Sequence, residues 1–167
     1  MSPEASFADN ATRTIVCATD LTETSRHALD TAIELSDALG AIHLHVLHVH
    51  ETVDRIESVQ DVEQRWTQLR DELEGYVREE LVRVSRDRAL PRNAKVITAV
   101  RYGKAYRQIL HYAVEANASW IVVGTHGRTG LGHVLGSVAE RIVRHAPCTV
   151  IVAKSPDVRD HLIQALP

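Results

Sequence analysis

Towards its C-terminal end the chain runs Val122-Val123-Gly124-Thr125-His126-Gly127-Arg128-Thr129-Gly130-Leu131-Gly132-His133-Val134-Leu135-Gly136-Ser137. The apolar segment 120–123 stops at Gly124, and Gly136-Ser137 opens a predicted helix. Glycines let backbone N–H groups approach a ligand closely, and a helix N-terminus adds unpaired donors and a partial positive charge. The loop contains Arg128, His126 and His133 but no carboxylate. A strand, a glycine-rich loop and a helix N-terminus in this order predict a site for a phosphate-bearing ligand.

Short apolar strands alternate with amphipathic helices along the rest of the chain. The patterns predict strands over 14–19, 42–49, 95–100, 120–123 and 149–153. They predict helices after the capping residues 22–25, over 61–86, after Gly103 and over 137–145. Because each strand is apolar on both faces, we expect one α/β domain: a five-stranded parallel sheet with helices on both sides. In doubly wound sheets ligands bind beyond the carboxyl ends of strands, where Asp20 and Gly124 both lie.

Length and composition are those of one ordinary globular domain. The chain has 167 residues, 44% of them hydrophobic, and a net charge of −3. We expect a polar, disordered lead-in over 1–12, a domain over 13–155 and a polar tail over 156–167. No basic block predicts nucleic-acid binding, and no apolar run approaches the roughly 20 residues that span a bilayer. With no secretory signal pattern at 1–10, we expect a cytoplasmic protein with two thiols, Cys17 and Cys148.

Several of these segments together resemble the universal stress protein (UspA) family, over about 14–154. Thr19-Asp20 with its Ser/Thr-rich turn is similar to the end of the family's first strand, and 47–49 to the end of its second. The most specific likeness runs from Val123 through Gly136-Ser137 to the segment 145–148. The resemblance implies a Rossmann-like sheet with strand order 3-2-1-4-5.

The resemblance also implies a nucleotide site. Nucleotide-binding members have the motif Gly-x₂-Gly-x₉-Gly-Ser/Thr around an ATP triphosphate, with Mg²⁺ as a possible companion. On that model phosphates would be held by Gly124, Gly127, Gly136 and Ser137. Asp20 would accept from the ribose hydroxyls, Thr19 and the backbone of Val49 would border the adenine, and Val123 and Val138 would flank the site. We expect a regulatory role rather than catalysis, and the residues leave slow ATP hydrolysis or self-phosphorylation open as an alternative.

Two departures from the family pattern bear on ATP binding. Only eight residues separate Gly127 from Gly136, where the motif has nine, and one residue shifts a helix start by about 1.5 Å. Ala18 stands where some ATP-binding members have proline. The shortened motif favours the alternative function, a nucleotide-free dimeric scaffold that acts through protein contacts.

Other readings of single residues stay open beside these. Asp20 also suits a turn or helix cap, and Ser137 suits a helix N-terminus whatever binds there. His43 and His45 alternate on one face of the second strand, with His48 and His50 on the other. This spacing suits a transition metal, but covered strand faces and the lack of a nearby carboxylate or cysteine argue against one. No nucleophile–base pattern predicts an enzyme.

A homodimer is the expected assembly. The last strand, 149–153, is short, apolar and expected at a sheet edge, where it would pair with a second copy. Polar residues after Lys154 would instead shield that edge. The protein partner of the dimer is not predicted.

Overall fold

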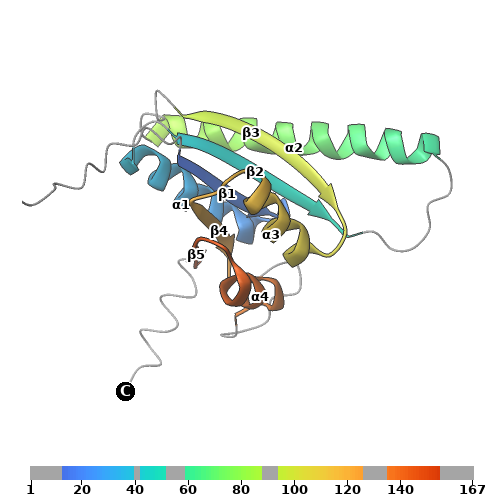
Figure 1. Ribbon diagram of the computed structural model, residues 1–167. Coiled ribbons are helices and arrows are strands. Elements are labelled where there is room, and N and C mark those ends of the chain that lie inside the picture. The colour runs from blue at the N-terminus through green and yellow to red at the C-terminus, as the bar shows by residue number, and fades with distance from the viewer. Residues whose placement is uncertain (1–12, 40–41, 52–58, 88–93, 126–134, 155–167) are drawn as a thin grey trace, which may run out of the picture.

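One parallel sheet of five strands forms the centre of the molecule (Figure 1). The structure is a computed structural model, which describes residues 13–39, 42–51, 59–87, 94–125 and 135–154. The strands are β1 (Arg13–Thr19), β2 (Ile42–His50), β3 (Lys95–Tyr102), β4 (Trp120–Gly124) and β5 (Thr149–Ala153). Their order is β3-β2-β1-β4-β5 and all four pairings are parallel. The predicted fold class and strand order are confirmed.

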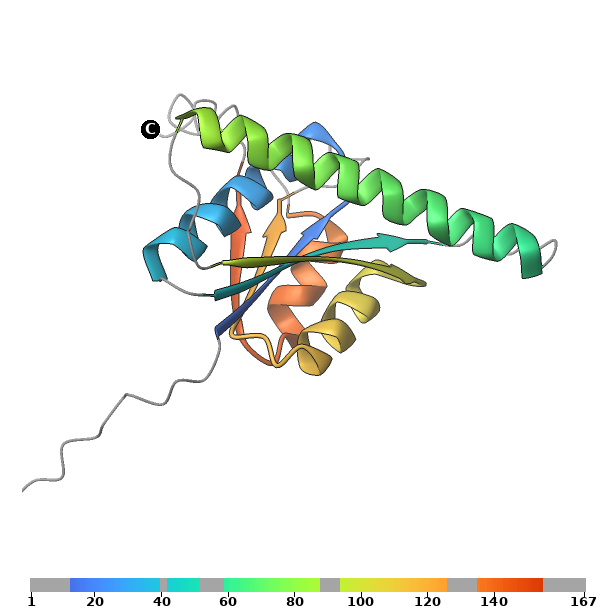
Figure 2. The same cartoon turned by 90° about the horizontal axis from the view of Figure 1, so that it is seen from above.

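In the described parts of the chain, four helices cover the two faces of the sheet. They are α1 (Glu23–Leu39), α2 (Val59–Asp87), α3 (Ala105–Glu115) and α4 (Ser137–His145). One core cluster joins β1 and β2 to α1 and α2, and a second joins the opposite face to α3 and α4. Figure 2, seen from above, shows α2 crossing the sheet on one side and α3 and α4 together on the other.

Alternation along β1 explains why its apolar run is continuous. Ile15 and Cys17 belong to the α1–α2 cluster, whereas Val16 belongs to the α3–α4 cluster. All three are fully buried, because successive side chains of a strand point to opposite faces and both faces here are covered.

The long helix α2 is held along one narrow stripe. Its buried apolar residues are spaced by four or seven: Leu69, Leu73, Val77 and Val84. At 29 residues, α2 is about 43 Å long, against about 30 Å for the nine-residue β2. Its N-terminal turns therefore extend past the end of the sheet (Figure 2). Within the described parts of the chain, no helix has the length and apolarity needed to cross a membrane.

Candidate functional site

The carboxyl ends of β1 and β4 lie side by side at the point where the winding of the sheet reverses. From β1 the chain goes to β2 and β3 on one side, and it returns to β4 and β5 on the other. The register pairs Cys17 with Val122, so Thr19-Asp20 and Gly124-Thr125 follow at neighbouring strand ends. Crevices at such reversal points are where doubly wound sheets bind ligands.

The N-terminus of α4 is tied to the same strand ends. The Gly136 N–H donates to the Thr125 carbonyl at 2.8 Å, and the Thr125 N–H donates to the Ala153 carbonyl of β5 at 3.1 Å. Gly136 is the N-cap and offers no side chain to the helix. The first intrahelical bond is made by the Glu140 N–H, so the amides before it have no acceptor inside α4. This helix end has donors and a partial positive charge for an anion.

Asp20 sits in a tight turn between β1 and α1. Its Oδ1 accepts the Thr22 N–H at 3.1 Å and also the Thr22 hydroxyl. Between them Leu21 has φ +64°, in the left-handed region that costs a leucine about 1–2 kcal/mol. The reading of Asp20 as a turn residue is thus correct, and the same turn fixes its carboxylate at the edge of the sheet.

Thr19 contributes its backbone rather than its side chain to this edge. Its side chain is buried, and its hydroxyl lies 2.8 Å from the Ser25 hydroxyl. Its carbonyl lies 2.9 Å from Nδ1 of the buried His48. A carbonyl only accepts, so the imidazole donates from Nδ1 and this bond sets its tautomer.

The apolar residues predicted for the site lie on the α3–α4 side. Val123 is buried in the second cluster and Val49 packs against that cluster half-buried. Val138 is 36% exposed on the first turn of α4, next to the exposed Ser137. The structure brings eight predicted residues to the carboxyl edge of the sheet and the start of α4: Thr19, Asp20, Val49, Val123, Gly124, Gly136, Ser137 and Val138. Gly127, with His126, Arg128 and His133, lies outside the described residues.

Three residues near the site were not among those predicted for it. Ser25 was recognised only as a capping residue, yet it contacts Thr19 six positions earlier. His48 was placed on the opposite strand face from His43 and His45, which is correct, but its bond to Thr19 had no signal in the sequence. Thr125 is buried and links β4, β5 and α4 through its backbone. In the sequence, only the position of Thr125 directly after the predicted strand 120–123 and Gly124 could have indicated that it lies near the site.

The histidines on the other strand face have protein partners. His45 Nδ1 lies 2.8 Å from the Tyr112 hydroxyl of α3. Burial lowers the His45 pKa, and the neighbouring His43 and Lys95 lower it further. Among the described residues, no three His, Cys, Asp or Glu side chains are grouped so that they could hold a metal ion.

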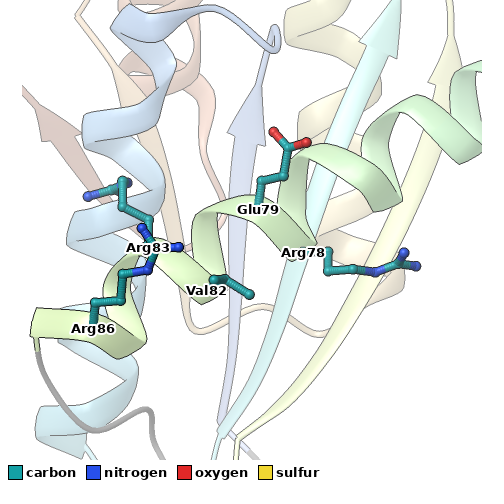
Figure 3. A pocket seen from close by; sticks show the side chains of 5 residues that line it. All are labelled: Arg78, Glu79, Val82, Arg83 and Arg86. Atoms are coloured by element: carbon teal, nitrogen blue, oxygen red, sulfur yellow. The ribbon is translucent and has the colours of Figure 1, made fainter.

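A separate hollow of about 310 Å³ lies on α2, lined by Arg78, Glu79, Val82, Arg83 and Arg86 (Figure 3). None of the predicted site residues that the structure describes lines it. One lining residue, Arg83, forms ion pairs with Asp30 of α1 and with the nearly buried Glu80 of α2. These ion pairs connect α2 to α1 and partly neutralise the charge of Arg83.

Comparison with known proteins gives one consistent result. The model of the universal stress protein family matches residues 11–154. Universal stress protein MJ0531 of Methanocaldococcus jannaschii is 32% identical over 153 residues, which cover 89% of this chain and 85% of the relative. Universal stress protein YxiE of Bacillus subtilis is 28% identical over 145 residues, covering 84% and 97%.

Solved structures agree on the fold. The universal stress protein UspA from Lactobacillus plantarum superposes with a TM-score of 0.67 at 22% identity, covering 86% of this chain and 99% of that one. A universal stress protein in complex with cAMP gives 0.59 at 20% identity, covering 84% and 95%. One from Archaeoglobus fulgidus in complex with dAMP gives 0.53 at 22% identity, covering 86% and 98%.

Fold and strand-end geometry define a doubly wound α/β domain with a candidate ligand site at its reversal point. Within that class, the chain belongs to the universal stress protein family.

Proposed function

We propose that this protein binds ATP at the carboxyl edge of the sheet, between β1 and β4, and works as a dimeric, non-catalytic cytoplasmic regulator of the stress response. The main supporting observation is the bond from the Gly136 N–H to the Thr125 carbonyl. It holds the uncapped N-terminus of α4 beside the end of β4, next to the strand that ends in Thr19-Asp20. An anionic ligand at this helix end would have a carboxylate nearby to accept from neutral hydroxyls.

Each predicted residue then has a proposed role, and for the residues other than Gly127 the described structure is compatible with it. Backbone amides around Gly124, Gly127 and Gly136, with the Ser137 hydroxyl, would bind the phosphates, with or without Mg²⁺. Asp20 would accept hydrogen bonds from the ribose. The backbones of Thr19 and Val49 would border the adenine, with Val123 and Val138 as apolar flanks. Binding of the phosphates would order a surface that a protein partner recognises.

Adenine as the base is supported by relatives rather than by the geometry. Two structures of similar fold are complexes with cAMP and dAMP, which share adenine with ATP. Both proteins are less than 25% identical to this chain, so they support an adenine nucleotide as the class of ligand but not the number of phosphates that it carries.

A second function is favoured by one feature of the sequence. The eight residues between Gly127 and Gly136 are one fewer than the family's nucleotide motif has. A shift of the α4 start against the loop would remove the phosphate site and leave a nucleotide-free dimeric scaffold that acts through protein contacts.

Calorimetric titration of ATP, with and without Mg²⁺, into extensively dialysed protein separates the two functions. We expect micromolar binding that Asp20→Ala weakens at least tenfold and that Gly127→Val abolishes, since a valine would fill the space through which amides approach phosphate. No saturation up to millimolar ATP would reject nucleotide binding and support the scaffold.

A further inference from the structure

A chain of hydrogen bonds encloses the turn that presents Asp20. The Leu21 N–H donates to the Thr19 hydroxyl oxygen at 3.1 Å. The Thr19 and Ser25 hydroxyls lie 2.8 Å apart, and the Ser25 hydroxyl donates to the Thr22 carbonyl at 2.8 Å.

The number of hydrogens on the Thr19 and Ser25 hydroxyls decides which of the two donates to the other. Each hydroxyl has one hydrogen to donate. Ser25 gives its hydrogen to the Thr22 carbonyl, so the bond between the two hydroxyls runs from Thr19 to Ser25. Thr19 therefore accepts from Leu21 and donates to Ser25, and the ring closes from Leu21 back to Thr22. The ring therefore includes Leu21, whose left-handed φ turns the backbone after Asp20.

The hydroxyl chain is shielded from solvent. Ser25 is 4% exposed and Thr19 is 6% exposed. The Tyr76 ring of α2 packs against the hydrophobic cluster shared by β1, β2, α1 and α2, and its hydroxyl oxygen is buried. Burial raises the Tyr76 pKa, while the Thr19 and Ser25 hydroxyls beside it act in the opposite direction. A water molecule would therefore not readily replace a hydroxyl removed from this place.

We infer that Ser25 is a positioning residue for Asp20: it holds the turn in the one conformation that presents the carboxylate to a ribose, and so sets the preference for ribonucleotides. This inference rests on the proposed nucleotide function. Without the Ser25 hydroxyl, the Thr19 hydroxyl loses the oxygen to which it donates, and the Thr22 carbonyl keeps only the Ser25 backbone N–H, at 3.1 Å. The turn is then closed by fewer bonds: Asp20 keeps its charge and its bonds to Thr22, but the turn that carries both residues is held less firmly.

The test compares ATP with 2′,3′-dideoxy-ATP, which lacks both ribose hydroxyls. Each is titrated by calorimetry into the wild-type chain and into Ser25→Ala, Asp20→Ala and Ser36→Ala. Ser36 is the matched control: it is a fully buried serine of the same helix, and its hydroxyl has no hydrogen-bond partner within the described residues. Exchange of the Leu21 and Thr22 amides, followed by NMR, reports on the turn without any nucleotide.

We expect the wild-type chain to prefer ATP over the dideoxy nucleotide at least tenfold. Ser25→Ala should reduce that ratio threefold or more while affinity for dideoxy-ATP stays unchanged, and the Leu21 amide should exchange at least tenfold faster. Ser36→Ala should change neither quantity. An unchanged ratio in Ser25→Ala, or an equal loss of affinity for both nucleotides, overturns the inference, because a purely structural role would weaken both ligands together.

Failure of the proposed function has a different signature. If the wild-type chain binds neither nucleotide, ATP binding is rejected, and the role of Ser25 in ribose preference is rejected with it. Amide exchange in Ser25→Ala then still decides whether this hydroxyl fixes the turn.

Discussion

At the scale of single residues, burial decides the chemistry of Cys17. This thiol is fully buried in β1, and burial, with a smaller contribution from Asp30, raises its pKa to about 12. An unfolded thiol has a pKa of about 8.5. The folded state therefore keeps its proton where the unfolded state has lost it.

Stability should consequently fall as pH rises from about 9 to 12. The unfolded chain binds fewer protons in this window, so Cys17 alone contributes a slope of up to about −1.4 kcal/mol per pH unit to the free energy of unfolding. Urea unfolding at pH 8, 9 and 10 should show a shallower decline in Cys17→Ala than in the wild-type chain. Cys148→Ala is the control, because that thiol is only half-buried. Parallel slopes in all three chains would contradict the assignment.

The local sequence indicated the strand ends that form the candidate site but not the hydrogen bonds between its residues. Asp20 and Gly124 were predicted because a strand must end where its apolar run stops, which depends on local sequence alone. The bonds of Ser25 to Thr19 and of His48 to Thr19 join residues 6 and 29 positions apart. Such bonds depend on the packing of β1, β2 and α1, and no local pattern encodes them.

At the scale of elements, α2 is joined to α1 by a nearly buried carboxylate. The Glu80 side chain is 6% exposed; its Oε1 lies 2.9 Å from Arg26 Nε of α1, and its Oε2 lies 2.7 Å from Arg83 Nε. Arg83 also pairs with Asp30 of α1. Removing Glu80 leaves two guanidinium groups with fewer partners at the junction of the helices.

We expect Glu80→Ala to lower the free energy of unfolding by about 2 kcal/mol. Breaking a buried ion pair costs more than this, but both arginines are over one third exposed and solvent screens part of the loss. Glu140→Ala is the control, since its pair with Arg144 is exposed on both sides and should change stability by less than about 0.5 kcal/mol. Equal denaturation midpoints for the two variants in urea would refute the prediction.

The positions of helices and strands were largely predictable, because apolar residues recur at a different spacing in a helix than in a strand. The predicted helix over 61–86 lies within α2, where the four-residue spacing of Leu69, Leu73 and Val77 repeats. The end of β3 was less predictable. The strand continues past Val100 to Tyr102, since Arg101 and Tyr102 pair with Val49 and His50 of β2. That extension is set by the length of the neighbouring strand.

At the scale of the whole molecule, strand order is the feature that residue patterns did not contain. Alternating strands and helices predicted a parallel sheet, but the order 3-2-1-4-5 came from the family resemblance and is confirmed. The order matters for function because it places β1 beside β4 and leaves β3 and β5 at the two edges. Edge strands present unpaired backbone groups to a second chain.

The proposed dimer can be tested at β5, which is an edge strand of the sheet. Ala153 pairs with Gly124 and accepts the Thr125 N–H, so its backbone faces β4. Backbone groups alternate in direction along a parallel strand, so those of Ile151 also face β4, and those of Val150 and Val152 face outward. Proline at 152 therefore removes an outward N–H and leaves the hydrogen bonds between β5 and β4 intact.

We expect Val152→Pro to be monomeric by analytical ultracentrifugation with a native circular dichroism spectrum, whereas Val152→Thr, which keeps the N–H, stays dimeric. Ile151→Pro should unfold, because it removes a bond to β4. A Val152→Pro chain that sediments as a folded dimer would place the interface on another face of the molecule.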